Sequence, residues 1–166
     1  ETNTFHLTNK ANLNTKMNYN SNFVELKNSL NQDYNILRSW LIPSLVEVIS
    51  NNKHNEYPQK IFEAGIIFDN TEKSKLAVLI THSKANFTEI KQVLDVLMSS
   101  LGLEYDIRET EHKSFIDGRT GIVSVKKKAI AYLGEINPIC LTNWGLENPV
   151  AALELDLSEL FHFVKD

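Results

Sequence analysis

The sequence has almost no cysteine, no excess of basic charge and no long apolar run. Cys140 is the only cysteine among 166 residues. It can form no disulfide bond within the chain, and one thiolate cannot build a zinc site, so we predict a reducing, cytoplasmic location. The formal net charge of -4 disfavours a surface dedicated to nucleic acid, because phosphate binding needs clustered Lys and Arg. No run of 18 or more apolar residues is present, so the sequence predicts no membrane span.

Histidines are present, but their spacing is not that of metal ligands. None of the five forms a pair at the separation typical of a zinc site, so no metal site is predicted. These histidines are His6, His54, His82, His112 and His162.

The length and composition fit one domain. With 42% hydrophobic and 23% charged residues, the chain lies in the globular range and can bury a core. It contains no internal repeat or long linker, so residues 1–166 are interpreted as a single domain. Because the first residue is Glu1 rather than Met, we expect a fragment of a longer chain.

Alternating and β-branched segments predict a sheet. Strands are expected at 4–8, 23–27, 36–38, 60–68, 76–80, 103–109, 121–125, 129–136 and 150–155. A polar turn at 69–74 suggests that its two flanking strands form an antiparallel pair. A helix is predicted from about Pro43, since proline fits a first helical turn. Helices lie between groups of strands rather than after each one, which favours an α+β fold with a largely antiparallel sheet flanked by helices.

The clearest predicted helix follows Asn86. Asn86 can cap this helix, and Glu89 can complete a capping box. Apolar residues recur at helical spacing from Phe87 to Leu101, and Gly102 provides a stop. This regular apolar face predicts a helix that covers one face of the sheet.

Four ordered segments carry a resemblance to a known family. They are Leu37-Arg38-Ser39-Trp40-Leu41-Ile42-Pro43-Ser44-Leu45, Ile61-Phe62-Glu63-Ala64-Gly65, Asp117-Gly118-Arg119 followed by Leu133-Gly134-Glu135-Ile136-Asn137-Pro138, and the closing run from Pro149 to Leu157. Together they resemble the catalytic-fold module of the beta subunit of phenylalanyl-tRNA synthetase, of the archaeal and eukaryotic type.

The resemblance implies a fold, a reaction and partners. The fold would be that of a class II aminoacyl-tRNA synthetase catalytic core. The whole enzyme would be an alpha2beta2 ligase that attaches phenylalanine to its tRNA with ATP and Mg²⁺. The catalytic alpha subunit would be the direct partner, and tRNA would be bound by the whole enzyme. Because family members carry a helix ahead of the first strand, the resemblance also predicts an exposed apolar patch where that helix would pack.

Two departures from an active class II module predict that this module is not catalytic. Such a module needs cationic groups on the phosphates of ATP. The two positions where arginine is expected hold Phe62-Glu63-Ala64 and Glu154-Leu155-Asp156-Leu157. Carboxylates there would repel a triphosphate and compete for its magnesium. We therefore predict no catalytic, cofactor-binding or metal-binding residue in this module; ATP and Mg²⁺ would be used elsewhere in the enzyme.

Two other functions stay open on the residues alone. A small stand-alone transferase would use Glu63, Arg119 and Glu135. Glu63, Glu135 and Glu154 would then meet as an acid/base set. The competing interpretation makes these carboxylates structural partners of arginines, with Arg38, Arg108 and Arg119 as candidates.

The second alternative is a KH-like RNA-binding module. Gly118-Arg119-Thr120-Gly121 has the Gly-x-x-Gly spacing of a KH loop. A KH loop joins two helices, whereas the flanking residues here are strand-like, so a tight turn at a strand start is favoured. The basic run Lys126-Lys127-Lys128 is interpreted as a solvated hairpin turn. Trp40 and Trp144 are candidates for either core residues or interface anchors.

Overall fold

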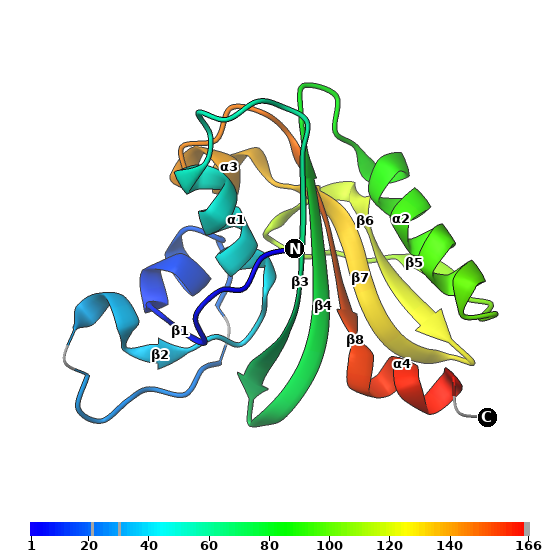
Figure 1. The fold of residues 1–166 in the computed structure, drawn as a ribbon, viewed down its shortest axis with the longest axis horizontal. Coiled ribbons are helices and arrows are strands. Elements are labelled where there is room, and N and C mark those ends of the chain that lie inside the picture. Colours follow the sequence, from blue (N-terminus) through cyan, green and yellow to red (C-terminus); the bar gives the residue numbers. More distant parts are fainter. Residues whose placement is uncertain (21, 30, 165–166) are drawn as a thin grey trace.

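One six-stranded antiparallel sheet organises the protein (Figure 1). The computed structural model describes residues 1–20, 22–29 and 31–164. Within these residues the strand order is β3-β4-β8-β7-β6-β5, and every neighbouring pair is antiparallel. The strands are β3 (Gln59–Asp69), β4 (Thr71–Thr81), β5 (Asp106–Glu109), β6 (Phe115–Val125), β7 (Lys128–Ile136) and β8 (Val150–Asp156). The predicted α+β class with an antiparallel sheet is confirmed.

Helices flank this sheet, and a small second sheet lies near the N-terminus. The helices are α1 (Ile42–Asn51), α2 (Phe87–Ser100), α3 (Pro138–Asn143) and α4 (Leu157–Val164). Strand β1 (Leu7–Thr8) pairs with β2 (Ile36–Leu37), and a π-helical turn (Ala11–Thr15) and a 3-10 turn (Gln32–Tyr34) lie between them. None of the helices in the described part of the chain has the length and hydropathy needed to cross a membrane.

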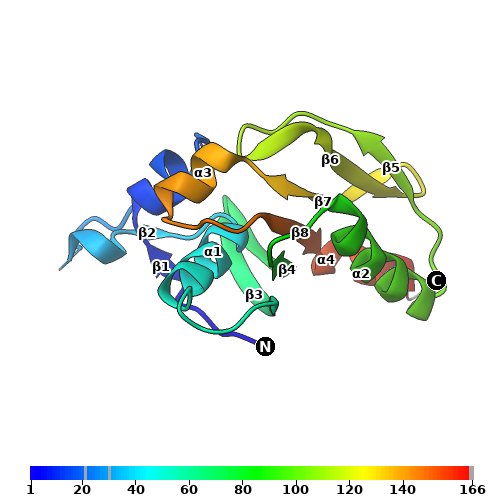
Figure 2. The ribbon, with the colours of Figure 1, turned by 90° about the horizontal axis from the view of Figure 1, so that it is seen from above.

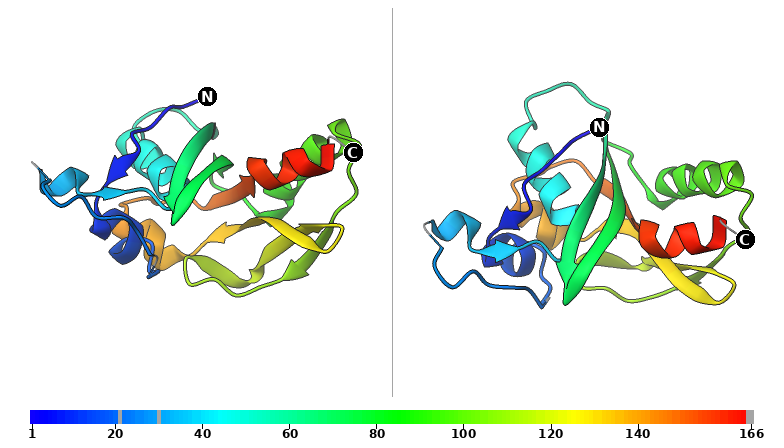
Figure 3. Two further views of the ribbon diagram at one scale, coloured as in Figure 1. Left: turned by 90° about the horizontal axis from the view of Figure 1, so that it is seen from below. Right: turned by 60° about the horizontal axis from the view of Figure 1, so that its bottom comes forward.

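The large sheet separates two hydrophobic cores. Helices α1 and α3 and the N-terminal segment lie on one side of the molecule, and α2 and α4 lie on the other (Figures 2 and 3). We call the two sides of the sheet the α1 face and the α2 face. The core on the α1 face includes Leu45, Ile49, Leu79 and Trp144. Burial of both faces explains why β8, which lies inside the sheet, is apolar at nearly every position.

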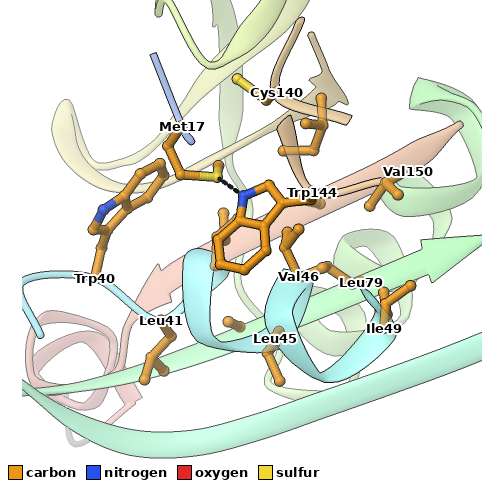
Figure 4. Packing of buried hydrophobic residues seen from close by; sticks show 14 of the residues in the cluster. Met17, Trp40, Leu41, Leu45, Val46, Ile49, Leu79, Cys140, Trp144 and Val150 are labelled. Atoms are coloured by element: carbon orange, nitrogen blue, oxygen red, sulfur yellow. Dashed lines mark hydrogen bonds between the residues drawn. The ribbon is translucent and has the colours of Figure 1, made fainter. Parts of the chain in front are cut away.

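Both tryptophans belong to the core of the α1 face. Trp40 is 6% exposed and Trp144 is 5% exposed. The indole N–H of Trp144 donates to the sulfur of Met17 at 3.2 Å, and both rings lie above α1 (Figure 4). Of the two sequence-based interpretations, core residue rather than interface anchor is correct.

Helix α2 forms as its sequence predicts. The Asn86 side chain accepts a hydrogen bond from the backbone N–H of Glu89 at 3.1 Å, which satisfies a free donor at the start of the helix. Ile90, Leu94 and Met98 are buried against the α2 face of the sheet. The predicted cap and apolar face are both confirmed, but the predicted capping box is not formed, because the Glu89 carboxylate instead contacts His82 Nε2 at 2.7 Å.

Several strand boundaries differ from the prediction. Residues 23–27 do not form a regular strand; they make one isolated bridge, between Glu25 and Ile36. The expected turn at 69–74 is also wrong, because β3 and β4 continue until only Asn70, at φ 57°, separates them. The tip of this hairpin extends beyond the core, so its polar residues give no alternating signal. Strand β5 begins at Asp106, three residues later than predicted.

The β6–β7 hairpin clarifies two sequence motifs. Lys126 and Lys127 have φ values of 47° and 71° and form the exposed turn, as predicted. Gly118-Arg119-Thr120-Gly121 lies within β6 rather than at its start. The pairing of β6 with β7 is irregular between Phe115 and Thr120, and Gly118 has φ 75°. The motif is therefore a strand irregularity with no flanking helices, which removes the structural basis for a KH-like loop.

Candidate functional site

Four cross-strand neighbours form a polar row on the α1 face of the sheet. Glu63 pairs with Ala77, Ala77 with Glu154, and Glu154 with Tyr132. Directly opposite residues project to the same side of a sheet. Two carboxylates and one phenol therefore lie side by side on a face that is otherwise apolar.

Glu154 is the most unusual member of this row. It is 2% exposed, and its Oε2 accepts hydrogen bonds from the backbone N–H groups of Leu41 at 2.9 Å and Ile42 at 3.1 Å. These donors lie at the start of α1, where N–H groups have no partner within the helix and carry partial positive charge. Burial nevertheless raises the pKa of Glu154 from its ordinary 4.5 to about 7, against the opposing effects of Lys75 and the two N–H donors.

A cleft of about 360 Å³ opens beside this carboxylate. We call it the Glu154 cleft. Its lining residues are Tyr19, Asn20, Asn22, Ser39, Trp40, Ile67, Asp69, Lys75, His112, Tyr132 and Glu154. A second hollow of about 1040 Å³ shares Tyr19, Asn20 and His112 with it.

Aromatic rings form one wall of the Glu154 cleft. The His112 ring stacks on Tyr19 at 4.4 Å between centroids and lies nearly parallel to Tyr132 at 5.9 Å. Trp40 lies 5.7 Å from the same His112 ring. Burial lowers the pKa of His112, so its ring is uncharged near neutral pH. The wall therefore presents neutral π faces.

The cations near the cleft are paired with carboxylates. Lys75 Nζ lies 3.0 Å from Asp156 Oδ2, and Lys73 Nζ lies 3.0 Å from Asp69 Oδ2. The Lys75–Asp156 pair is largely buried, and it holds the pKa of Asp156 below its ordinary value despite partial burial. The charge of Lys75 is therefore balanced by Asp156, so among the described residues the lining of the cleft has no excess of positive charge.

Glu63 belongs to a separate buried network. Its Oε1 accepts a hydrogen bond from Arg38 Nη1 at 2.8 Å, and both side chains are almost fully buried. Thr4 Oγ1 donates to Glu63 Oε2 at 2.7 Å, and Arg38 Nε donates to the carbonyl of Ile66 at 2.8 Å. This network ties the N-terminal segment and the residues before α1 to strand β3. The structural pairing of Glu63 with Arg38 is confirmed.

Glu135 lies on the opposite face of the sheet. Its Oε2 accepts from Arg119 Nη1 at 2.6 Å, and its Oε1 accepts from the backbone N–H of Phe87, the first residue of α2. Glu135 therefore anchors the start of α2, whereas Glu154 anchors the start of α1. Since Glu63 and Glu135 lie on opposite faces, the transferase set of Glu63, Arg119 and Glu135 is not assembled, and the acid/base set with Glu154 does not form.

An apolar groove is the second candidate surface. It lies between strands β3 and β4 and helix α2, has a volume of about 480 Å³, and is lined by Lys60, Ile61, Phe62, Val78, Ile80, Glu89, Gln92, Val93 and Val96. Phe62 is 41% exposed and Val96 is 68% exposed. We call this exposed apolar surface the β3–α2 groove.

Sequence reasoning found some of these residues and missed others. Glu154 stands out as the only charged residue inside the apolar run of β8. His112 lacks the spacing of a metal ligand and carries no other signal in the sequence, but the structure places it in an aromatic cluster. Tyr132 carries no local signal, because its position in an apolar strand is typical of a core residue. The described residues contain no group of three or more His, Cys, Asp or Glu able to hold a metal ion.

Comparison with known proteins supplies a family. A model of the family described as "Phenylalanyl tRNA synthetase beta chain CLM domain" matches residues 1–157. The chain is 47% identical over 167 residues to the phenylalanine–tRNA ligase beta subunit of Pyrococcus abyssi, and 44% identical over 180 residues to that of Thermococcus onnurineus. These alignments cover 95% of this chain but only 30% and 32% of the two relatives. The chain therefore spans about a third of the length of these relatives.

The fold is shared with a solved synthetase. The crystal structure of pyrrolysyl-tRNA synthetase from Desulfitobacterium hafniense superimposes with a TM-score of 0.81 over 99% of this chain and 62% of that one. The sequence identity is 16%, so this likeness shows the fold alone. The predicted class II synthetase-like core is confirmed.

Proposed function

We propose that this chain, which belongs to the family of phenylalanyl tRNA synthetase beta chain CLM domains, is a non-catalytic module that packs against a catalytic alpha subunit. The complete enzyme would be the ligase that attaches phenylalanine to its tRNA with ATP. The module would contribute to assembly rather than to chemistry. This proposal rests on the charge of the Glu154 cleft and on the exposed β3–α2 groove.

The charge distribution is the single observation that carries the non-catalytic assignment. Adenylate formation develops negative charge on a triphosphate, which must be met by cations that are free to contact it. In the Glu154 cleft the central group is a buried carboxylate, and Lys75 is already paired with Asp156. Arg38 is fully buried and bound to Glu63. The residues present therefore do not fit ATP or its magnesium, and we derive no catalytic step here.

The β3–α2 groove supports the packing role. Phe62 and Val96 leave a large apolar surface in contact with water, and their neighbours Val78 and Val93 extend it. Burying such a surface against another protein is favourable by about 25 cal/mol per Å² of apolar area. Strand β3 is also an edge strand of the sheet, which gives a partner access to this side.

Two measurements on the purified protein test the proposal. ATP–pyrophosphate exchange with phenylalanine should stay at background, and the protein should capture a phenylalanyl-tRNA synthetase alpha subunit in a pull-down. Exchange activity that is abolished by Glu154→Gln would contradict the non-catalytic assignment. A complete failure to capture the alpha subunit would contradict the packing role.

A matched pair of variants tests the groove itself. Val96→Glu places a charge in the β3–α2 groove and should reduce capture at least tenfold, because an unpaired charge is expensive to bury. Ile139→Glu is the control, since Ile139 is 57% exposed on α3, away from the groove. Both substitutions fall at exposed positions, so both variants should melt at the wild-type temperature. Equal capture by the two variants would place the interface elsewhere.

A further inference from the structure

The Glu154 cleft has features that a purely structural module does not need. Among the residues that the structure describes, its carboxylate forms no ion pair, because Lys75 pairs with Asp156 and Arg38 pairs with Glu63. These two cations lower the pKa of Glu154 only by charge acting at a distance. A neutral side chain could accept the same two N–H bonds from Leu41 and Ile42 without bringing a charge into the core.

The wall of the cleft is suited to a cation. The faces of aromatic rings carry negative potential and attract an organic ammonium group that lies within about 6 Å. Tyr19, Trp40 and Tyr132 surround His112, and the His112 pKa is lowered by burial. The wall therefore offers several ring faces and no competing positive charge near neutral pH.

The lining of the Glu154 cleft includes a buried polar atom without a hydrogen-bond partner among the described residues. Ser39 Oγ is buried and has no hydrogen-bond partner among the described residues, and Ser39 lines the cleft. A buried polar group without a partner destabilises the protein, so such groups are uncommon and point to a missing partner. The Ser39 hydroxyl can accept a hydrogen bond from an ammonium group.

We propose that the Glu154 cleft binds a small organic amine in its protonated form. The ammonium group would lie against the carboxylate of Glu154, and its carbon skeleton would lie against the rings of Trp40, His112 and Tyr132. The volume of about 360 Å³ is at the small end of the range for ligand sites and suits a compound of about ten heavy atoms. This inference does not depend on the packing role of the β3–α2 groove, which lies on the other face of the sheet.

The test compares three probes that share a phenylethyl skeleton and differ in charge. They are 2-phenylethylamine, the neutral 2-phenylethanol and the anionic 3-phenylpropionate, each titrated into the protein at pH 8 and followed by amide chemical shifts. The amine should bind at least tenfold more tightly than the alcohol and should shift the resonances of cleft residues. The anion should not bind. Equal affinity for amine and alcohol, or no binding of the amine at millimolar concentration, would overturn the proposal.

Two variants locate the site. Glu154→Gln should weaken binding of 2-phenylethylamine at least tenfold and leave that of 2-phenylethanol unchanged. Glu147→Gln, which removes an exposed carboxylate outside the cleft, should bind the amine as the wild type does. If the two variants bind the amine equally well, the carboxylate assignment is wrong. Should Glu154→Gln fail to fold, the comparison of the three probes on wild-type protein still decides the outcome.

Discussion

The raised pKa of Glu154 predicts a specific pH dependence of stability. A carboxyl group with a pKa of 4.5 when unfolded and about 7 when folded keeps its proton longer in the folded state. Between these two pH values unfolding releases a proton, so raising the pH favours unfolding. The folded protein therefore carries no penalty from Glu154 below about pH 4.5. It loses stability as the pH rises to about 7 and carries the full penalty above that value.

Glu154→Gln isolates this effect. The glutamine oxygen can still accept the hydrogen bonds from Leu41 and Ile42, but the side chain stays neutral at every pH. Multiplying the difference between about 7 and 4.5 by about 1.4 kcal/mol per pH unit gives about 3–4 kcal/mol. The variant should therefore match the wild type near pH 4 and exceed its free energy of unfolding by about 3–4 kcal/mol at pH 8.

The assay is urea unfolding of both proteins from pH 4 to pH 9 at constant ionic strength. Comparing the two at each pH removes the titration of groups that they share, such as Asp156 and His112. The difference in unfolding free energy should grow between pH 4.5 and 7 and be constant above pH 8. A difference that is independent of pH, or one that shrinks as the pH rises, would refute the assignment of Glu154 as a buried carboxylate with a raised pKa.

Three further predictions test the fold. Leu94→Ala removes a fully buried side chain from α2 and should lower the free energy of unfolding by about 2–5 kcal/mol. The control Val96→Ala, at a position 68% exposed, should change it by less than about 0.5 kcal/mol. If the two variants lose the same stability in urea unfolding, the assignment of Leu94 to the buried face of α2 is wrong. Arg38→Met leaves the buried Glu63 without its cation and should destabilise by about 3–5 kcal/mol, and adding Glu63→Gln should restore part of that loss if the two groups are paired. Gly134→Ala would place a methyl group 2.8 Å from a backbone oxygen of β6, and a loss of about 1–3 kcal/mol is expected by thermal unfolding; an unchanged melting temperature would show that this contact relaxes freely.

The sequence predicted the elements whose apolar pattern is continuous. Helix α2 has an uninterrupted helical repeat and a cap at Asn86, so its position followed from local signals. The predicted strand at 23–27 and the predicted turn at 69–74 were both wrong, and the residues at 70–72 are exposed and lie outside both cores. Alternation of apolar and polar residues arises only where one side of a strand is buried, and the tip of the β3–β4 hairpin is exposed.

The candidate site was only partly predictable, since it is built from tertiary contacts. Glu154 could be singled out as a charge within an apolar strand, but its partners, the N–H groups of Leu41 and Ile42, are more than 100 residues away in sequence. The grouping of His112 with Tyr19 and Tyr132 joins three separate segments, and no spacing in the sequence encodes it. That Glu63 pairs with an arginine, in contrast, followed from the general need of a buried arginine for a carboxylate, but the sequence left Arg38, Arg108 and Arg119 open as its partner.

Glu135 and Glu154 both anchor the start of a helix, but they differ in how their charge is balanced. Each carboxylate accepts a hydrogen bond from backbone at the start of a helix, Glu135 for α2 and Glu154 for α1. Glu135 also contacts the exposed Arg119, so its charge is balanced. Glu154 has the same anchoring role, but no cation of the described part of the chain forms an ion pair with it, and burial raises its pKa to about 7. Because anchoring a helix requires only an acceptor, the charge of Glu154 is unexplained by the fold and is best explained by a ligand that carries the opposite charge.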